Sequence, residues 1–302
     1  RWLSNRYEDR RVAFKLHPQP NRTLAVEILK GKAATADDPK RGTMARGSVQ
    51  CPFCPTTVPP DQVKEQFISG RDGRILLSVA SKRGGGDGVE FRAATVDDCD
   101  RYAAAAAALA EAEAVHDNPF LPLVPDEPIP EQSRGNNLGR YGMTTWGKVF
   151  NARQLLALST FVRAIHTAHS ILLAKGASSD EAATIALYLS LTLSRVVLIL
   201  SEASVWHNTR NTVQRATAGH KLQMAWDYAE VNPISGLPGG WSALNEWALE
   251  SIRKLVGAAP QPAHVQWGDA TQLPYPDDHF DAVLTDPPYY DSVSYSDLAD
   301  MQ

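Results

Sequence analysis

Apolar residues recur at helical spacing over two long stretches in the middle of the chain. The first stretch follows Asn151, a residue type favoured at helix N-caps, and stops at Gly176, which readily ends a helix. Ser178 and Glu181 then stand at the spacing of a capping box, which predicts a second helix reaching about Ala203. Together the two stretches predict an antiparallel helix pair around a common core.

The sequence predicts two more helices. None of the expected helices is expected to cross a membrane. Residues 99–116 favour a helix by intrinsic propensity because they are rich in alanine, and residues 241–257 carry another helical pattern. The most apolar run, residues 185–200, contains Arg195 and two serines and is shorter than the roughly 20 residues that a bilayer requires. We therefore interpret this run as a buried helix.

Residues 1–98 have the pattern of strands and turns. Short β-type runs occupy residues 24–29, 75–80 and 89–95, and the glycine-rich "SKRGGGDG" joins the last two as a hairpin. Residues 118–132 contain five prolines, which exclude regular structure. They indicate a linker or an extended arm across a neighbouring surface.

Residues 263–290 change the pattern again and have the rhythm of an α/β sheet. The expected strand "HVQW" leads to Asp269 and Ala270, and the expected strand "FDAVLT" ends at Asp286, before two consecutive prolines. Prolines have no backbone N–H to donate, so they end the strand and form a rigid loop. Because such sheets bind ligands beyond the carboxyl ends of their strands, we expect the two aspartates to meet ligands at one sheet edge.

Composition and charge narrow the class of protein. The chain has 302 residues, 43% of them hydrophobic, so it can hold two domains of ordinary size with real cores. A net charge of −4 argues against a histone-like nucleic-acid binder. Three cysteines with no disulfide-rich pattern, and no visible secretory signal, indicate a reducing, cytoplasmic setting.

The tetrapeptide Asp286-Pro287-Pro288-Tyr289 has residue types suited to one chemistry. An exocyclic amino group of adenine or cytosine is hard to methylate because its lone pair is delocalised into the ring. A carboxylate and a fixed backbone carbonyl can accept hydrogen bonds from its two N–H groups and favour an sp³ nitrogen, and Asp286 and Pro287 supply this pair. The Pro287-Pro288 pair keeps the carbonyl rigid, and Tyr289 can stack on the base.

A wider similarity extends over most of the chain. It is carried, in chain order, by "CPFC" (51–54), "RYGMTTWGKVFNARQLLALSTFV" (140–162), "AWDYAEVNPIS" (225–235) and "GDATQLPYPDDHFDAVLTDPPYYDSVSYSDLAD" (268–300). With these stretches the chain resembles the adenine-specific DNA methylases that contain a zinc ribbon. The resemblance implies S-adenosylmethionine-dependent methylation of DNA, most simply at N6 of adenine, in restriction–modification or phage defence. It also implies DNA and other restriction or defence subunits as partners.

The resemblance further implies where the cofactor and substrate bind. Asp269 and Ala270 are expected near the adenine of the cofactor, and the DPPY tetrapeptide at the target base. The family binds S-adenosylmethionine through a glycine-rich loop of the type FxGxG, and no such stretch lies between a strand and a helix here. We therefore expect the cofactor loop upstream of Arg1. Two alternatives stay open: an N4-cytosine or RNA amino-methyltransferase, and a non-catalytic nucleic-acid-binding module.

The implied fold is mixed α/β, with a partial Rossmann-like methyltransferase core, a helical insert and a small zinc-ribbon-like β module. The domains expected are the β module, an alanine-rich helix with a proline-rich linker, the helical region and the partial core, over residues 1–98, 99–135, 136–240 and 241–302.

Cys51 and Cys54 have the spacing of a zinc knuckle, which aims two thiolates at one metal. A structural zinc site needs four ligands, and the sequence has no second CxxC; the resemblance puts the partner pair upstream. Pro55 replaces the glycine that usually follows a knuckle. A redox role would need a following helix to lower the thiol pKa, which "PTTVPPDQ" cannot supply. Cys99 is interpreted as a small buried residue.

The stretch "VWHNTRNT" (205–212) is a second candidate site. It is either a helix end with polar caps or a surface that presents four side chains to DNA or to the catalytic pocket: Trp206, His207, Asn208 and Arg210.

Two further groups could contact a nucleic acid. Residues 1–50 contain eleven Lys or Arg against five Asp or Glu, which indicates either a solvated surface or a zone of phosphate contacts. Tyr290, Asp291 and Tyr295 extend the DPPY loop, and the two tyrosines either pack that loop or touch the substrate.

Overall fold

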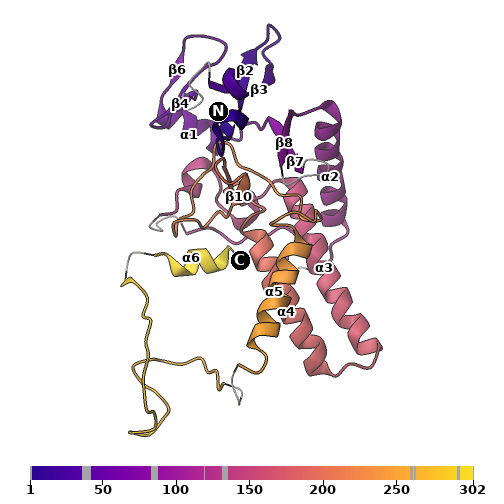
Figure 1. Ribbon diagram of the computed structural model, residues 1–302, viewed down its shortest axis with the longest axis vertical. Coiled ribbons are helices and arrows are strands. Elements are labelled where there is room, and N and C mark those ends of the chain that lie inside the picture. Colours follow the sequence, from indigo (N-terminus) through magenta and orange to yellow (C-terminus); the bar gives the residue numbers. More distant parts are fainter. Residues whose placement is uncertain are drawn as a thin grey trace.

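The computed structural model describes most of the chain, namely residues 2–35, 42–82, 88–118, 120–130, 135–258, 261, 263–290 and 293–301. Small sheets gather around the N-terminus, and long helices form the other end of the molecule (Figure 1). The mixed α/β class is confirmed. Within the described residues every sheet is antiparallel, so the parallel sheet of a Rossmann-like core is not among them.

Ten strands make four small sheets in the described part of the chain. The first two sheets have three strands each and are built from β1 (Trp2–Ser4), β2 (Val12–Pro18) and β3 (Leu24–Lys30), and from β4 (Met44–Ala45), β5 (Ser48–Gln50) and β6 (Thr57–Val58). The other two are hairpins, β7 (Ser78–Lys82) with β8 (Val89–Ala93) and β9 (Val205–His207) with β10 (Thr212–Gln214).

The strand predictions for the first hundred residues largely hold. β3 covers the run predicted at 24–29, and β7 and β8 pair as the predicted hairpin, whose turn at 83–87 lies outside the described residues. The strand predicted at 75–80 begins later, at Ser78. Just before this stretch, Arg74 donates to Glu202, 128 positions further along the chain.

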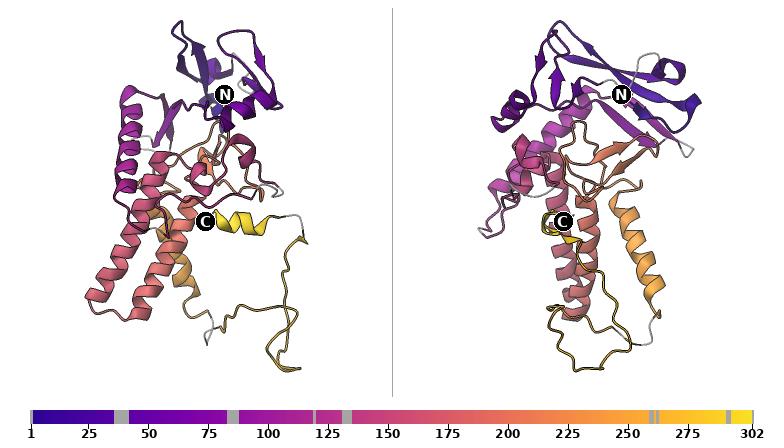
Figure 2. Two further views of the ribbon diagram at one scale, coloured as in Figure 1. Left: turned by 180° about the vertical axis from the view of Figure 1, so that it is seen from behind. Right: turned by 90° about the vertical axis from the view of Figure 1, so that its left-hand side faces the viewer.

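The helices described are α1 (Pro60–Ile68), α2 (Val96–Ala114), α3 (Ala152–Ala174), α4 (Ser179–Val197), α5 (Trp241–Leu255) and α6 (Tyr295–Asp300). The connections also contain short 3-10 turns, η1 (Glu8–Arg10) and η2 (Gly31–Thr35) between strands, and η3 (Leu138–Tyr141) and η4 (Trp146–Val149) between α2 and α3. α3 and α4 form the predicted antiparallel pair (Figures 1 and 2).

The ends of α3 and α4 are set by the residues that the sequence indicated. Asn151 and Ser178 each form a capping box, in which Asn151 Oδ1 accepts from Gln154 N at 3.0 Å and Ser178 Oγ accepts from Glu181 N at 3.2 Å. Gly176 takes the left-handed conformation that follows a helix end, with φ of 91°. Local hydrogen bonds therefore fix where both helices begin.

The prediction of a buried helix at 185–200 is only partly right. Val196 and Leu200 are buried, but Leu187 and Leu191 on α4 are 58% and 54% exposed. α3 is the one helix in the described residues with the length and composition to cross a membrane, and it packs against α2 and α4. Core helices of soluble proteins share these properties.

The proline-rich residues 120–130 form the extended arm that was one of the two predictions. Ile129 on this arm is 5% exposed, and its backbone N–H donates to Thr144 O at 2.9 Å. It belongs to a core cluster that also contains Leu138, Leu222 and, from the far end of the chain, Met301. The chain after residue 290 thus returns to the body through α6.

The two strands expected in residues 263–290 are wrong for this structure. Both stretches are coil, and the segment makes a long excursion from the body (Figure 1). Val265 and Trp267 are 90% and 98% exposed, and Leu284 is 95% exposed. A strand of a parallel sheet needs hydrogen-bonded neighbours on its edges and apolar cover on both faces, and the described residues place neither beside this segment.

Candidate functional site

The DPPY tetrapeptide lies on the exposed excursion, where nothing in the described chain covers it. Tyr289 is 62% exposed, and its N–H donates to Tyr295 Oη, at the start of α6, at 3.3 Å. The carboxylate of Asp286 and the carbonyl of Pro287 accept no hydrogen bond from the described residues. The two acceptors that the chemistry requires are therefore open to a ligand.

Tyr290 forms a turn directly after the DPPY tetrapeptide. Its φ of 50° is left-handed, a conformation that is uncommon for a bulky residue, and its N–H donates to Pro288 O at 2.8 Å. The ring is 96% exposed. Tyr295, in contrast, holds the loop through its hydroxyl. The adjacent Asp291 lies outside the described residues.

Asp269 and Ala270 do not form a cofactor pocket here. The Asp269 carboxylate accepts hydrogen bonds from Thr271 N and Oγ1, both at 2.8 Å, and these bonds lower the pKa of Asp269. The Asp269 side chain thus stabilises the turn formed by residues 269–271. Both residues are exposed, so they do not by themselves hold an adenine ring.

Cys51 and Cys54 are free cysteines in the structure. They lie in the tight connection between β5 and β6, where Cys51 N donates to Thr56 O at 2.9 Å and Phe53 N donates to Cys51 Sγ at 3.4 Å. Hydrogen bonds from Thr56 and then from Cys51 lower the pKa of Cys54. No group of three or more His, Cys, Asp or Glu gathers for a metal within the described residues. The donors present fit two zinc positions of four.

Cys99, which the sequence suggested was buried, is exposed. Helix α2, which begins at Val96 after the N-cap Thr95, packs on α3 and leaves Cys99 uncovered.

The stretch at 205–212 is a β-hairpin and not a helix end. β9 and β10 pair with Trp206 opposite Val213, and the loop places Arg210 at its tip. Trp206 is structural: its Nε1 donates to Leu3 O at 2.5 Å, and its ring meets Phe91 edge to face at 5.9 Å. His207 Nδ1 lies 3.1 Å from Thr209 Oγ1.

A large cleft, of about 2190 Å³, separates this hairpin and the N-terminal sheet from the helical body. Its lining includes Trp206, Asn208 and Arg210, but not Asp269 or Asp286. The structure therefore does not bring the two predicted groups of site residues together.

Inside the cleft lies an ion pair that the sequence analysis missed. Glu202 is 2% exposed, and the Arg74 guanidinium binds it in a bidentate manner, with Nε–Oε1 at 2.5 Å and Nη2–Oε2 at 2.6 Å. Burial raises the pKa of Glu202, while the bonds from Arg74 oppose the rise. A carboxylate in the apolar run "VLILSEASV" was a signal of a buried, paired charge.

A second polar group fixes the segment around residues 225–235. Asn151 Nδ2 donates to Glu230 Oε2 at 2.9 Å and to Tyr228 Oη at 3.2 Å, and Arg153 Nε donates to Glu230 Oε1 at 2.6 Å. Burial, and then the charge of Glu202, raise the pKa of Tyr228. The tyrosine is therefore a neutral hydroxyl at physiological pH, and the group ties α3 to the cleft wall.

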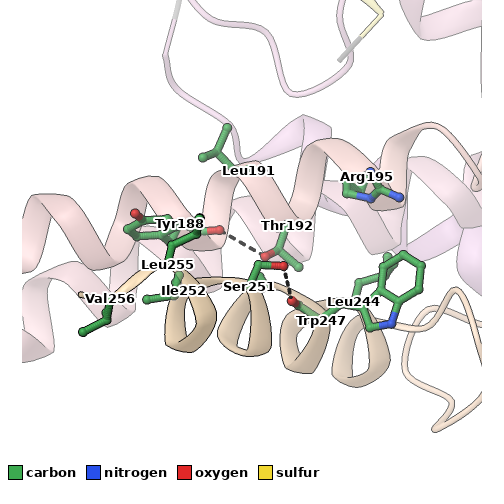
Figure 3. Close-up of a pocket in the computed structure, with 11 residues that line it drawn as sticks. Tyr188, Leu191, Thr192, Arg195, Leu244, Trp247, Ser251, Ile252, Leu255 and Val256 are labelled. Carbon is green, nitrogen blue, oxygen red and sulfur yellow. Dashed lines mark hydrogen bonds between the residues drawn. The ribbon is translucent and has the colours of Figure 1, made fainter. Parts of the chain in front are cut away.

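An apolar groove of about 490 Å³ runs between α4 and α5 (Figure 3). Tyr188 and Leu191 line it from α4, and Trp247, Ile252 and Leu255 line it from α5. Trp247 is 64% and Leu255 70% exposed. Exposed apolar surface of this kind is typical of places where a protein element or a ligand binds.

The chain matches no protein-family model, no curated protein sequence and no solved structure.

Proposed function

We propose that this chain belongs to an enzyme that methylates an exocyclic amino group of DNA, most simply N6 of adenine, with S-adenosylmethionine as methyl donor. The observation that carries the proposal is the DPPY loop, with the Asp286 carboxylate and the Pro287 carbonyl both open to a ligand. Restriction–modification or phage defence is the setting that the resemblance implies.

In this proposal, the residues of this chain bind the amino group that is methylated. Asp286 accepts a hydrogen bond from one N–H of the amino group, and the Pro287 carbonyl accepts from the other. Both acceptors interact more strongly as positive charge develops on the nitrogen, so they stabilise the transition state more than the bound substrate. Tyr289 stacks on the base, which such enzymes take out of the duplex.

We also propose that residues 264–267 and 280–285 become strands of a Rossmann-like sheet when further strands and a cofactor loop join them. The apolar groove between α4 and α5 is then the face on which that sheet packs. Residues 256–263 can span about 26–29 Å when extended, and α5 with 15 residues is only about 22 Å long, so the segment can reach any part of the groove. Two exposed apolar surfaces of one chain would thereby cover each other.

The test uses the enzyme as proposed here, with the cofactor loop present, and its Asp286→Ala variant. Loss of one preorganised partner of the amine is expected to lower kcat by about 10²–10³ while cofactor binding stays nearly unchanged. Methyl incorporation into duplex DNA is measured from labelled cofactor, with binding measured by calorimetry. Asp281→Ala, which removes a carboxylate from the same segment outside the motif, is the matched control and should keep its activity.

The role of Tyr289 is tested in the same assay. Tyr289→Ala should weaken binding of the target base by roughly 1–3 kcal/mol, whereas Tyr289→Phe should be mild because the ring face makes the contact. Mass spectrometry of the digested product separates N6-methyladenine from N4-methylcytosine, and an RNA substrate tests the RNA alternative. Wild-type turnover by Asp286→Ala would remove the methyltransferase proposal.

A non-catalytic nucleic-acid-binding module is the second candidate function. One observation favours it: the cleft that carries the exposed arginines of the N-terminal segment and the hairpin is separate from the DPPY loop. Retained DNA binding without any methyl transfer by the full-length protein would select this function.

A further inference from the structure

Two basic stretches that lie about 200 positions apart in the sequence meet at one edge of the large cleft. The N–H of Asn5 donates to Asn208 O at 2.9 Å, and Trp206 Nε1 donates to Leu3 O at 2.5 Å. These bonds fasten the N-terminal segment to the β9–β10 hairpin. Arg6 and Arg210, close neighbours of the bonded asparagines, therefore come onto the same surface, and both line the cleft.

An aromatic ring lies within this surface. The Arg6 guanidinium lies 5.0 Å and the Arg10 guanidinium 5.9 Å from the centre of the Tyr7 ring, and Tyr7 is itself 50% exposed. We name these residues, with Arg210, the arginine–tyrosine cluster: Arg6, Tyr7, Arg10 and Arg210.

The hairpin holds Arg210 in a defined position. The N–H groups of Arg210 and Asn211 both donate to His207 O, at 3.1 and 2.8 Å, and Asn211 has the left-handed φ of 54° that closes the loop. A cation fixed in this way loses little backbone freedom when it binds a ligand.

The balance of charge in the cleft favours an anion. Each carboxylate that lines it already has a partner: Asp9 with Arg10, Asp72 and Glu202 with Arg74, Asp98 with Arg92, Glu230 with Arg153, and Asp227 with another group. Four lining cations form no ion pair among the described residues: Arg6, Lys30, Lys82 and Arg210. The Asp9–Arg10 pair is long, at 3.5 Å, and exposed, so Arg10 can exchange it for a stronger anion.

We propose that the arginine–tyrosine cluster binds the phosphate backbone of DNA, with Tyr7 stacking on an unpaired base next to it. Guanidinium groups with an exposed aromatic ring are the combination that recognises phosphodiesters and unstacked bases. The proposal rests on DNA as the substrate class of the proposed function, but it needs neither the DPPY loop nor the cofactor.

The experiment measures binding of the 302-residue chain to a fluorescent DNA duplex with a short single-stranded gap, by anisotropy over a range of salt concentrations. The triple variant Arg6→Ala/Arg10→Ala/Arg210→Ala should reduce the slope of log affinity against log salt by about 2–3, because each lost phosphate contact removes about 0.9. Affinity at about 0.1 M salt should fall roughly 10-fold or more.

A control of equal charge separates local contact from net charge. Arg163→Ala/Arg253→Ala/Lys254→Ala also removes three cations, all outside the lining of the cleft, and should leave the slope and affinity nearly unchanged. Tyr7→Ala should weaken binding to the gapped duplex on the order of 10-fold and binding to the intact duplex much less, and Tyr7→Phe should behave as wild type. Unchanged thermal unfolding confirms that the variants are folded.

Several outcomes would overturn the proposal: equal losses in both triple variants, no loss in the cluster variant, or tighter binding of an RNA of the same sequence. The result is independent of methyl transfer, because binding of the 302-residue chain is measured without a methyl donor. Loss of turnover with intact binding, or the reverse, therefore tells the two proposals apart.

Discussion

Leu200 and Leu284 are the same residue type in two regions of very different structure. Leu200, just after α4, is 1% exposed, whereas Leu284, in the segment of residues 263–290, is 95% exposed. The helices beside Leu200 satisfy their backbone hydrogen bonds internally and need only an apolar neighbour. A strand at 280–285 needs bonded neighbours along its edges. The region with the chemical signature is thus the region whose structure depends most on partners.

The largest expected effect is in proteolysis. Chymotrypsin should cut the 302-residue chain beside Trp267, Phe280 and Leu284 at least about 10³-fold faster than beside Phe161 in α3. Sites in the body are cut only from the unfolded fraction, which is about 10⁻³–10⁻⁶ for a stable protein, whereas the segment needs no unfolding. Rates are measured by mass spectrometry of timed digests.

The same digest of a protein that carries the proposed cofactor loop and further strands sharpens the comparison. If the segment forms strands there, these three sites should become as slow as those in the body. Slow cleavage at Trp267 in the 302-residue chain alone would contradict the exposed conformation.

The next effect concerns stability and uses the two leucines. Leu200→Ala should lower the free energy of unfolding by about 2–5 kcal/mol, because it leaves a cavity in a packed cluster. Leu284→Ala is the same chemical change at an exposed position and should stay within about 0.5 kcal/mol. Urea unfolding, followed by circular dichroism, gives both values. A loss above about 1 kcal/mol for Leu284→Ala would show that the segment packs in solution.

The sequence predicts those parts of the fold that local bonds determine. Asn151 and Ser178 predict where α3 and α4 begin, because a capping box involves only four consecutive residues. The hairpin of β7 and β8 follows from a short glycine-rich connection. Two boundaries shift: α2 begins at Val96 because of the local cap at Thr95, and β7 begins only at Ser78, after Arg74 has bonded to the distant Glu202.

The candidate site was harder to predict from the sequence, because it depends on contacts between segments that are far apart in the chain. The strands at 264–267 and 280–285 were inferred from apolar runs, but their partners are not among the described residues. The arginine–tyrosine cluster joins Arg6 to Arg210 through backbone bonds between Asn5 and Asn208, and no local pattern encodes such a contact. The chemistry proposed for the DPPY loop, in contrast, is inferred from residues that are consecutive in the sequence.

The smallest effect compares two aspartates with lowered pKa. Bonds from Arg92, and then from the N-cap Thr95, hold the pKa of Asp98 well below its usual range, and bonds from Thr271 lower that of Asp269. Asp98 joins β8 to the start of α2, so its bonds form when the body folds. Asp269 bonds only to a residue two positions away, and this turn can persist when the body unfolds.

Only Asp98 should therefore make stability depend on pH. A folded pKa below the unfolded one contributes stability that is fully present above the ordinary aspartate pKa of about 4 and is lost as pH falls through the folded value. Asp98→Asn should lower Tm by a few degrees at most at pH 7, and the difference from wild type should shrink as the pH falls below about 4. Asp269→Asn should leave Tm unchanged at every pH between about 3 and 7. A pH-dependent Tm difference for Asp269→Asn equal to that of Asp98→Asn would show that the two regions fold as one unit.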